Sequence, residues 1–367
     1  MWPVPTHQLE TITDRKVEVA LFDLLRSRDR EKPWPLLPIL AFIAPGGCGK
    51  STLIEHLIEQ CSVAGRPAIP YAHIDFTLPV PPTDLLAILV RLREELQKRA
   101  DGQGRYLRFP RFDLGALVAK AAETADLAAP EPDTIQKKLA TGTQFIESLG
   151  ALGSSLGFTL PVIGPLVAGV KLALQLPGVR DTLASLEAHT GWTWYRQQGT
   201  VAGLGAEATM KDVLLRLQML SLLGTQERED LVSKLLPAAF MADLSAALVE
   251  ARPPQAWSPD ANVVIFLDGF EALQSSFSTT ATRLLQVLTT EPRKEGHTDP
   301  LLLVIGGRDR VPGMPEDEEP VAFPRTDGEA TAKEQARDLY AKWQQRLPST
   351  PTALRRLRLD NLNASSE

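Results

Sequence analysis

A short glycine-rich stretch between an apolar run and an amphipathic run constrains this chain more than any other feature of its sequence. The apolar run 39–43 predicts a buried strand, and the apolar spacing over 53–61 predicts a helix. A strand, a glycine-rich turn and a Lys-Ser pair that opens a helix form the context that a G-x-x-x-x-G-K-[ST] phosphate loop requires. The residues predicted to form this loop and to bind a nucleotide are Ala44, Pro45, Gly46, Gly47, Cys48, Gly49, Lys50, Ser51 and Thr52.

The chemistry of such a loop is local. Its glycines let successive backbone N–H groups curl around an anion, and the following helix N-terminus adds positive potential. Lys50 would neutralise the β- and γ-phosphates, and Ser51 would be a ligand of the Mg²⁺ that accompanies them. The first glycine of the pattern is Ala44 here, whereas three later glycines remain. The flanking elements favour nucleotide binding over the alternative, a glycine-rich turn with an incidental lysine.

Composition places the chain among soluble globular proteins and limits its partners. The 367 residues exceed one ordinary domain, with 44% hydrophobic and 23% charged residues. The formal net charge of −6 supplies no global basic field, so nucleic acid is not expected as a direct ligand. The 2 cysteines argue against a disulfide framework, the 5 histidines show no zinc spacing, and residues 1–15 lack a secretory pattern. We therefore expect a cytoplasmic protein.

The order of apolar runs predicts an α/β fold: a P-loop NTPase core with a mainly parallel sheet flanked by helices, plus a large α-helical insertion between the phosphate loop and a later acidic motif. Short apolar runs predict further strands at 68–76, 263–267, 301–305 and 354–359. Periodic runs predict helices at 83–99, 114–127, 210–223, 227–250, 279–289 and 333–346. The predicted domains are an N-terminal helical approach (1–35), the first part of the core (36–113), the insertion (114–250) and the second part of the core (251–367).

Asp268 follows the predicted strand 263–267 and is the candidate for a second metal ligand. An acidic side chain at the carboxyl end of a buried strand lies near the phosphate loop when both strands share a sheet. The alternative is a strand-terminal cap, because Asp followed by Gly269 is also ordinary turn chemistry. The upstream phosphate loop favours the metal role.

Two further side chains are candidates for catalysis. Glu271 could polarise the attacking water as a general base, and its alternative is an exposed glutamate in the first turn of the next helix. Arg308 follows the strand 301–305 and could report whether a γ-phosphate is present. Its alternative is an ion pair with Asp309 or Glu271 that only shapes the loop.

These stretches together resemble the STAND class of P-loop NTPases, signal-transducing ATPases that act as switches. The resemblance is carried by the phosphate loop and by four further stretches, 108–114, 235–244, 267–273 and 305–308, the first two being similar to bacterial members with tetratricopeptide-type repeats. It covers about residues 36–362 and implies ATP and Mg²⁺ as ligands, with Lys50, Glu271 and Arg308 in catalysis. It also implies a switch in which Mg-ATP favours an active, oligomeric signalling or defence state. The guanine-reading Asn-Lys-x-Asp pattern is not found, which favours ATP over GTP.

The chain departs from the family pattern at several points. Ala272 replaces the usual second acid after Glu271, so hydrolysis is expected to be slow. Gly306 and Gly307 replace the Thr-Ser before the sensor arginine, and the Gly-Arg-Glu motif is not found in residues 1–35. The family continues with a helical lid, a winged helix and sensor repeats, which do not follow here. We therefore expect a truncated chain or a minimal NTPase whose sensor and effector reside on a partner protein.

The insertion leaves a membrane alternative open. Residues 148–170 carry no charge, a length that could span a bilayer, and a KAP-like NTPase would place 148–176 there. The segment is rich in small residues and contains Pro161 and Pro165, without flanking lysines or aromatic belts. A buried helical hairpin is therefore favoured. A nucleotide-binding scaffold with little turnover is the other alternative to an ATPase switch.

Overall fold

The computed structural model describes residues 15–26, 37, 39–61, 69–101, 107, 109–124, 190–198, 213, 216–217, 229, 231–249, 262–290, 301–308, 326, 328–345 and 356–360. The chain divides into two compact units, which we describe separately. The first unit comprises Met1–Leu107 and Leu244–Glu367, and the second unit comprises Arg108–Asp243. The second unit overlaps the predicted insertion 114–250.

The first unit is built on a parallel sheet, as predicted. Its strands are β1 (Ile39–Ile43), β2 (Tyr71–Asp75), β3 (Val263–Asp268), β4 (Leu301–Gly307) and β5 (Arg356–Asp360). They lie in the order β2-β3-β4-β1-β5, and every neighbouring pair is parallel. Thus β4 lies between the strand that precedes the phosphate loop and the strand that ends in Asp268. The α/β class with helices on a parallel sheet is confirmed.

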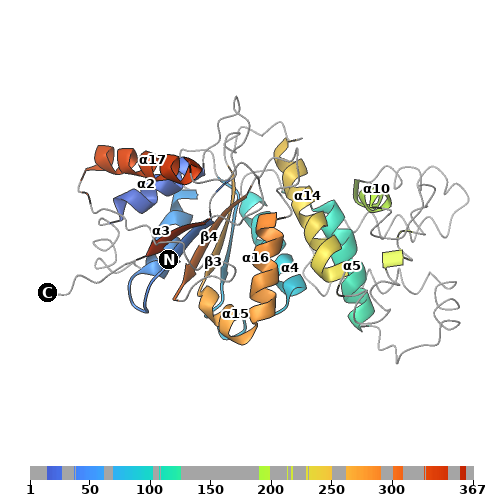
Figure 1. Ribbon diagram of the computed structural model, residues 1–367. Coiled ribbons are helices and arrows are strands. Elements are labelled where there is room, and N and C mark those ends of the chain that lie inside the picture. Colours follow the sequence, from blue (N-terminus) through green and yellow to red (C-terminus); the bar gives the residue numbers. More distant parts are fainter. Residues whose placement is uncertain are drawn as a thin grey trace, which may run out of the picture. The chain divides into compact units, whose positions relative to one another are not determined.

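Central strands of this sheet are buried along their whole length because both faces are covered. All residues of β1, β3 and β4 are buried, as expected for parallel strands with helices on either side. One face packs against α2 (Lys16–Leu25), α3 (Lys50–Cys61) and α17 (Glu329–Gln345), which share one hydrophobic core with the sheet. Figure 1 shows α4 (Leu85–Asp101), α15 (Phe270–Ser276) and α16 (Ser278–Thr290) on the opposite side.

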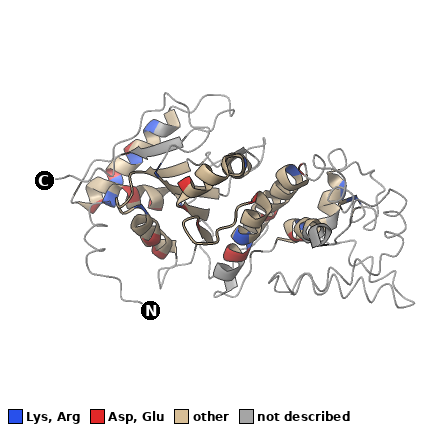
Figure 2. Ribbon diagram, turned by 90° about the horizontal axis from the view of Figure 1, so that it is seen from below, with Lys and Arg blue, Asp and Glu red and all other residues tan. Residues whose placement is uncertain are grey.

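Helix α4 illustrates how well the amphipathic pattern predicts packing. The predicted helix 83–99 begins at Leu85, where the Asp84 carboxylate accepts a hydrogen bond of 2.8 Å from the Ala87 N–H as an N-cap. The leucines expected on one face are all buried: Leu85, Leu86, Leu89, Leu92 and Leu96. On the other side, Arg91 pairs with Glu94 at 3.5 Å and with Glu95 at 3.0 Å. Acidic and basic residues are likewise interspersed on the described helices (Figure 2).

The second unit contains α5 (Pro110–Thr124), α10 (Thr190–Gln197), a π-helical turn (Leu231–Leu235) and the start of α14 (Leu236–Val249). Pro237 is the second residue of α14, within the predicted helix 227–250, and the change from π to α geometry occurs one residue before it. Proline removes one backbone donor and crowds the preceding turn, so a widened turn before it is the expected consequence.

The predicted helix 114–127 was placed too late. Helix α5 begins at Pro110 because Asp243, far along the chain, caps its N-terminus. The Asp243 carboxylate accepts hydrogen bonds from the backbone N–H groups of Arg111 (3.0 Å) and Phe112 (2.9 Å). It also accepts a bond of 3.0 Å from the Arg111 guanidinium. Local sequence contains no sign of this cap.

Aromatic side chains fill the core of the second unit. Phe240 stacks on Phe109, with ring centroids 5.3 Å apart, and meets the Phe112 ring edge-on at 5.4 Å. Tyr195 on α10 is fully buried, and its hydroxyl packs directly against Gly115. This tyrosine is a core residue.

The segment 148–176, named above as the membrane alternative, and most of the predicted helix 210–223 lie outside the described residues. Within the described ranges, no helix is long and apolar enough to cross a bilayer.

Candidate functional site

The predicted phosphate loop connects β1 to α3 and has the backbone that its glycines predict. Gly47 and Gly49 have φ angles of 81° and 74°, in the left-handed region that favours glycine. A Cβ added at Gly47 would meet no atom within 4 Å, so backbone conformation, and not space, requires glycine there. Exposure differs along the loop: Ala44 and Lys50 are buried, Cys48, Gly49 and Thr52 are half-buried, and Pro45, Gly46, Gly47 and Ser51 are exposed.

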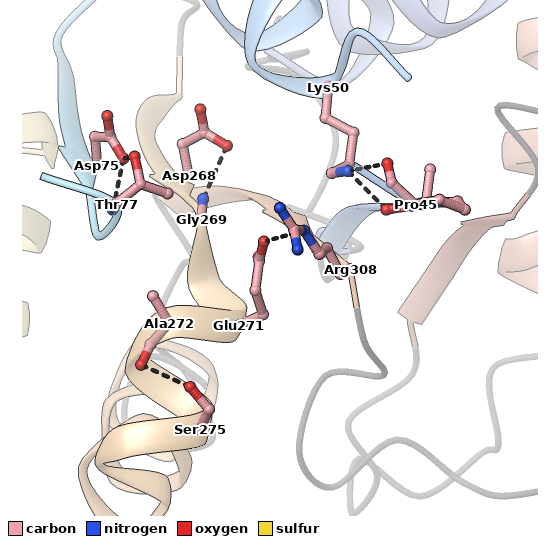
Figure 3. Close-up of polar contacts among 11 residues, drawn as sticks. Pro45, Lys50, Asp75, Thr77, Asp268, Gly269, Glu271, Ala272, Ser275 and Arg308 are labelled. Atoms are coloured by element: carbon pink, nitrogen blue, oxygen red, sulfur yellow. Dashed lines mark hydrogen bonds and ion pairs between the residues drawn. The ribbon is translucent and has the colours of Figure 1, made fainter. Parts of the chain in front are cut away.

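The Lys50 side chain is hydrogen-bonded to backbone carbonyl groups of the loop that precedes it. Its Nζ donates hydrogen bonds to the carbonyl oxygens of Ala44 (2.6 Å) and Pro45 (2.7 Å), as Figure 3 shows. An ammonium group has three donors, and these contacts use two of them. The lysine nitrogen is therefore held next to Ala44 and Pro45, and its third donor could bind a phosphate in the loop.

Alanine at the first position of the loop has a simple structural account. The Ala44 N–H donates to the Gly307 carbonyl oxygen at 3.1 Å and so continues the pairing of β1 with β4. Only later residues of the loop adopt positive φ, so a methyl group is tolerated at Ala44.

Asp268 is the last residue of β3 and is only 7% exposed. One of its carboxylate oxygens accepts a hydrogen bond of 2.8 Å from the Gly269 N–H, which is the turn contact named above as the alternative role. The same oxygen would lie 2.7 Å from a Cβ at Gly306 on β4, and Ile54 would lie 2.6 Å from it. The Asp268 carboxylate therefore packs against the backbone of β4 at Gly306, and the missing side chain of Gly306 provides the space for it. A side chain at Gly306 would therefore collide with the Asp268 carboxylate and with Ile54.

Glu271 and Arg308 form an ion pair. The Arg308 Nε lies 3.4 Å from the Glu271 Oε1, and the two side chains are 63% and 20% exposed. The second carboxylate oxygen of Glu271 is buried and has no hydrogen-bond partner among the described residues. The pairing named above as an alternative for Arg308 is thus present.

Arg308 also lies against the phosphate loop. A Cβ at Gly46 would be 3.2 Å from its Nη2 and 3.3 Å from its Cζ. The arginine at the end of β4 therefore bridges the loop and Glu271, and Figure 3 shows it between them. The strand order accounts for this arrangement, because β4 separates β1 from β3.

The predicted magnesium ligands suit that ion but form a sparse set. Ser51 and Asp268 supply a hydroxyl and a carboxylate, oxygen donors of the kind that Mg²⁺ prefers. Among the described residues, no cluster of three or more His, Cys, Asp or Glu could hold a metal ion by itself. Mg²⁺ in nucleotide sites takes few protein ligands and completes its shell with phosphate and water. The residues therefore fit a magnesium that arrives with a nucleotide.

Sequence reasoning did not assign a role to Asp75 and Thr77, which lie beside this site. Asp75 ends β2 and is in register with Asp268 on β3. A strand-terminal acid was visible in the sequence, but its neighbour in the sheet was not.

Comparison with known proteins leaves the chain without an assigned relative. No protein-family model matches it, and no curated protein or solved structure shows significant similarity to it.

Proposed function

We propose that this chain is an ATP-binding molecular switch that hydrolyses ATP slowly, of the STAND type. The observation that carries the proposal is the position of Arg308, whose guanidinium lies against Gly46 of the phosphate loop and pairs with Glu271. A glycine loop with a lysine at its mouth is common to phosphate sites. Phosphoryl-transfer sites combine such a loop with an arginine that stabilises charge in the transition state and a residue that positions the attacking water, and Arg308 and Glu271 lie where they could take these two roles.

Each residue has a distinct task in this proposal. The backbone N–H groups of the loop and Lys50 would bind the β- and γ-phosphates. Ser51 and Asp268 would hold Mg²⁺, which when bound neutralises phosphate charge. Glu271 would accept a proton from the attacking water, for which its carboxylate has to leave Arg308. Arg308 would then be able to contact the γ-phosphate, so the nucleotide and Glu271 compete for one guanidinium.

This competition supports slow turnover, as does Ala272 in place of a second acid. By analogy with the resembling family, Mg-ATP would favour a self-associated state, and a partner protein would supply the sensor or effector. The output would be signalling or antiviral defence.

A second candidate function is a nucleotide-binding scaffold with little turnover. The Glu271–Arg308 pair favours it, because the carboxylate is turned toward the guanidinium and is not placed to accept a proton from an attacking water.

Binding and hydrolysis of ATP and GTP by the purified chain, measured with its mass in solution, test both functions. We expect Mg-ATP to bind, to be hydrolysed slowly and to increase the mass. Hydrolysis should disappear in Lys50→Ala and in Glu271→Gln, while Glu271→Gln keeps its affinity for ATP. Binding without hydrolysis in the parent chain would favour the scaffold, and absence of nucleotide binding would exclude both functions.

A further inference from the structure

Three residues at the end of β2 contact the turn that carries Asp268 and Glu271, through a hydrogen bond and side-chain packing. We call Asp75, Phe76 and Thr77 the β2 tip. The Phe76 N–H donates a hydrogen bond of 2.9 Å to the Asp268 carbonyl oxygen, which extends the β2–β3 pairing by one step. The rings of Phe76 and Phe270 meet edge-on with centroids 6.0 Å apart. The β2 tip therefore contacts the turn on both sides of Gly269.

Thr77 packs on Gly269 itself. Gly269 has a φ angle of 62°, in the left-handed region, and a Cβ there would collide with the Thr77 Cγ2 and lie 3.2 Å from the Thr77 nitrogen. Gly269 is also the N-cap of α15 and, lacking a side chain, makes no side-chain capping bond to that helix. The direction in which Glu271 leaves the turn thus depends on a glycine that has wide conformational freedom. The packing of Thr77 against Gly269 restricts the backbone conformations that Gly269 can adopt.

Asp75 fixes Thr77 in turn. One carboxylate oxygen of Asp75 accepts two hydrogen bonds, from the Thr77 N–H (2.8 Å) and from the Thr77 hydroxyl (2.6 Å). Thr77 is exposed to solvent, so these two bonds and the packing on Gly269 hold its position. Figure 3 shows the pair beside Asp268 and Gly269.

We propose that Asp75, acting through Thr77, is a positioning residue that sets the orientation of Asp268 and Glu271 for ATP hydrolysis. This inference rests on the proposed function. Asp75 does not act on the nucleotide here; its carboxylate orients Thr77, and Thr77 confines the glycine between the two acids. The contribution of Asp75 therefore comes from hydrogen-bond acceptance, which an amide oxygen can supply equally well.

The first test compares Asp75→Ala with Asp75→Asn by steady-state hydrolysis of Mg-ATP. Substitution of a residue that orients a reacting group costs about 10-fold or more. We expect kcat to fall about 10-fold in Asp75→Ala with KM nearly unchanged, and to recover in Asp75→Asn, whose amide oxygen accepts the same bonds. Equal losses of kcat in Asp75→Ala and Asp75→Asn would overturn the proposal, because the negative charge of Asp75 would then matter rather than the hydrogen bonds that it accepts from Thr77. Unchanged kcat in Asp75→Ala, or equal losses in affinity and kcat, would also overturn it.

The second test is a double-mutant cycle on the contact between Thr77 and Gly269. Gly269→Ala adds the colliding methyl group, and Thr77→Ser removes the Thr77 methyl group but keeps the hydroxyl bond to Asp75. We expect Gly269→Ala to lower kcat and the unfolding temperature, and Thr77→Ser to lower kcat by a smaller factor, because the methyl contact is lost while the bonds to Asp75 remain. The double variant should lose less than the sum of the two single losses, because the added methyl group then has room. Additive effects on both quantities would show that this contact does not position the turn.

These outcomes separate failure of the inference from failure of the proposed function. A parent chain that binds Mg-ATP and does not hydrolyse it would contradict the ATPase and with it any positioning for turnover. A parent chain that hydrolyses ATP, with Asp75→Ala as active as the parent, would contradict the positioning role alone.

Discussion

Under the proposed function, the Lys50 ammonium group is the single charge on which nucleotide affinity should depend most. Its Nζ lies 2.6 Å and 2.7 Å from two carbonyl oxygens of the loop, so its position is fixed by hydrogen bonds. Lys50→Ala removes a charge-assisted hydrogen bond to phosphate, worth about 2 kcal/mol. We predict a Kd for Mg-ATP that is higher by about 30-fold. Isothermal titration calorimetry measures it, with Lys342→Ala on the exposed side of α17 as the control.

Arg308 should distinguish ATP from ADP if it reads the γ-phosphate. Its guanidinium already lies 3.2 Å from the position of a Cβ on Gly46, close enough to turn toward a phosphate in the loop. We predict that Arg308→Ala raises the Kd for ATP about 10-fold and leaves the Kd for ADP near its parent value. Arg337→Ala, an exposed arginine of α17, is the matched control. Equal losses for both nucleotides would mean that Arg308 only shapes the loop.

At the scale of single elements, the N-terminus of α5 depends on a carboxylate from a distant part of the chain. Asp243 accepts two backbone N–H groups and the Arg111 guanidinium in a buried setting. Removal of one partner from a buried ion pair costs about 3 to 5 kcal/mol, because the other charge is left uncompensated. We predict a loss of this size in the unfolding free energy of the second unit for Asp243→Ala above about pH 8, where the Asp243 carboxylate is ionised. Denaturant unfolding followed by circular dichroism measures it, and Asp243→Asn should lose less because its amide oxygen still caps the helix.

The same carboxylate predicts a pH dependence with a definite sign. Burial raises the pKa of Asp243 from 3.8 to about 8, against the opposing effects of the Phe112 N–H and Arg111. Between these two pH values the folded chain holds a proton that the unfolded chain has lost, so the contribution of Asp243 to stability falls as pH rises. This slope should be absent in Asp243→Asn. A parent chain whose second unit gains stability through this interval relative to Asp243→Asn would contradict the prediction.

The sequence predicts an element well when the interactions that determine it lie within that element, and poorly when they come from distant residues. Apolar runs and helical spacing were sufficient for β1, β3 and α4, because burial on known faces determines both pattern and structure. The start of α5 could not be predicted, because its cap lies 131 positions away. The contact of Thr77 with Gly269 was likewise hidden, since it follows from the pairing of β2 with β3.

At the scale of the whole molecule, every candidate site residue belongs to the first unit. Lys50 and Asp75 come from Met1–Leu107, and Asp268, Glu271 and Arg308 come from Leu244–Glu367. Two segments that are far apart in sequence therefore join in one sheet to build the site. A ligand that binds only the folded site stabilises the unit that contains it.

Binding should thus stabilise one unit and not the other. At a Mg-ATP concentration of 100 times Kd, the unfolding free energy of the first unit should rise by about 2.7 kcal/mol. Hydrogen exchange read by mass spectrometry resolves this rise by segment. We predict slower exchange in α3 and α15, and unchanged exchange in α10 of the second unit. The same experiment on Lys50→Ala at equal nucleotide concentration should show little protection anywhere. Protection confined to α10 would place the nucleotide elsewhere, and a phosphate loop that binds Mg-ATP could not produce it.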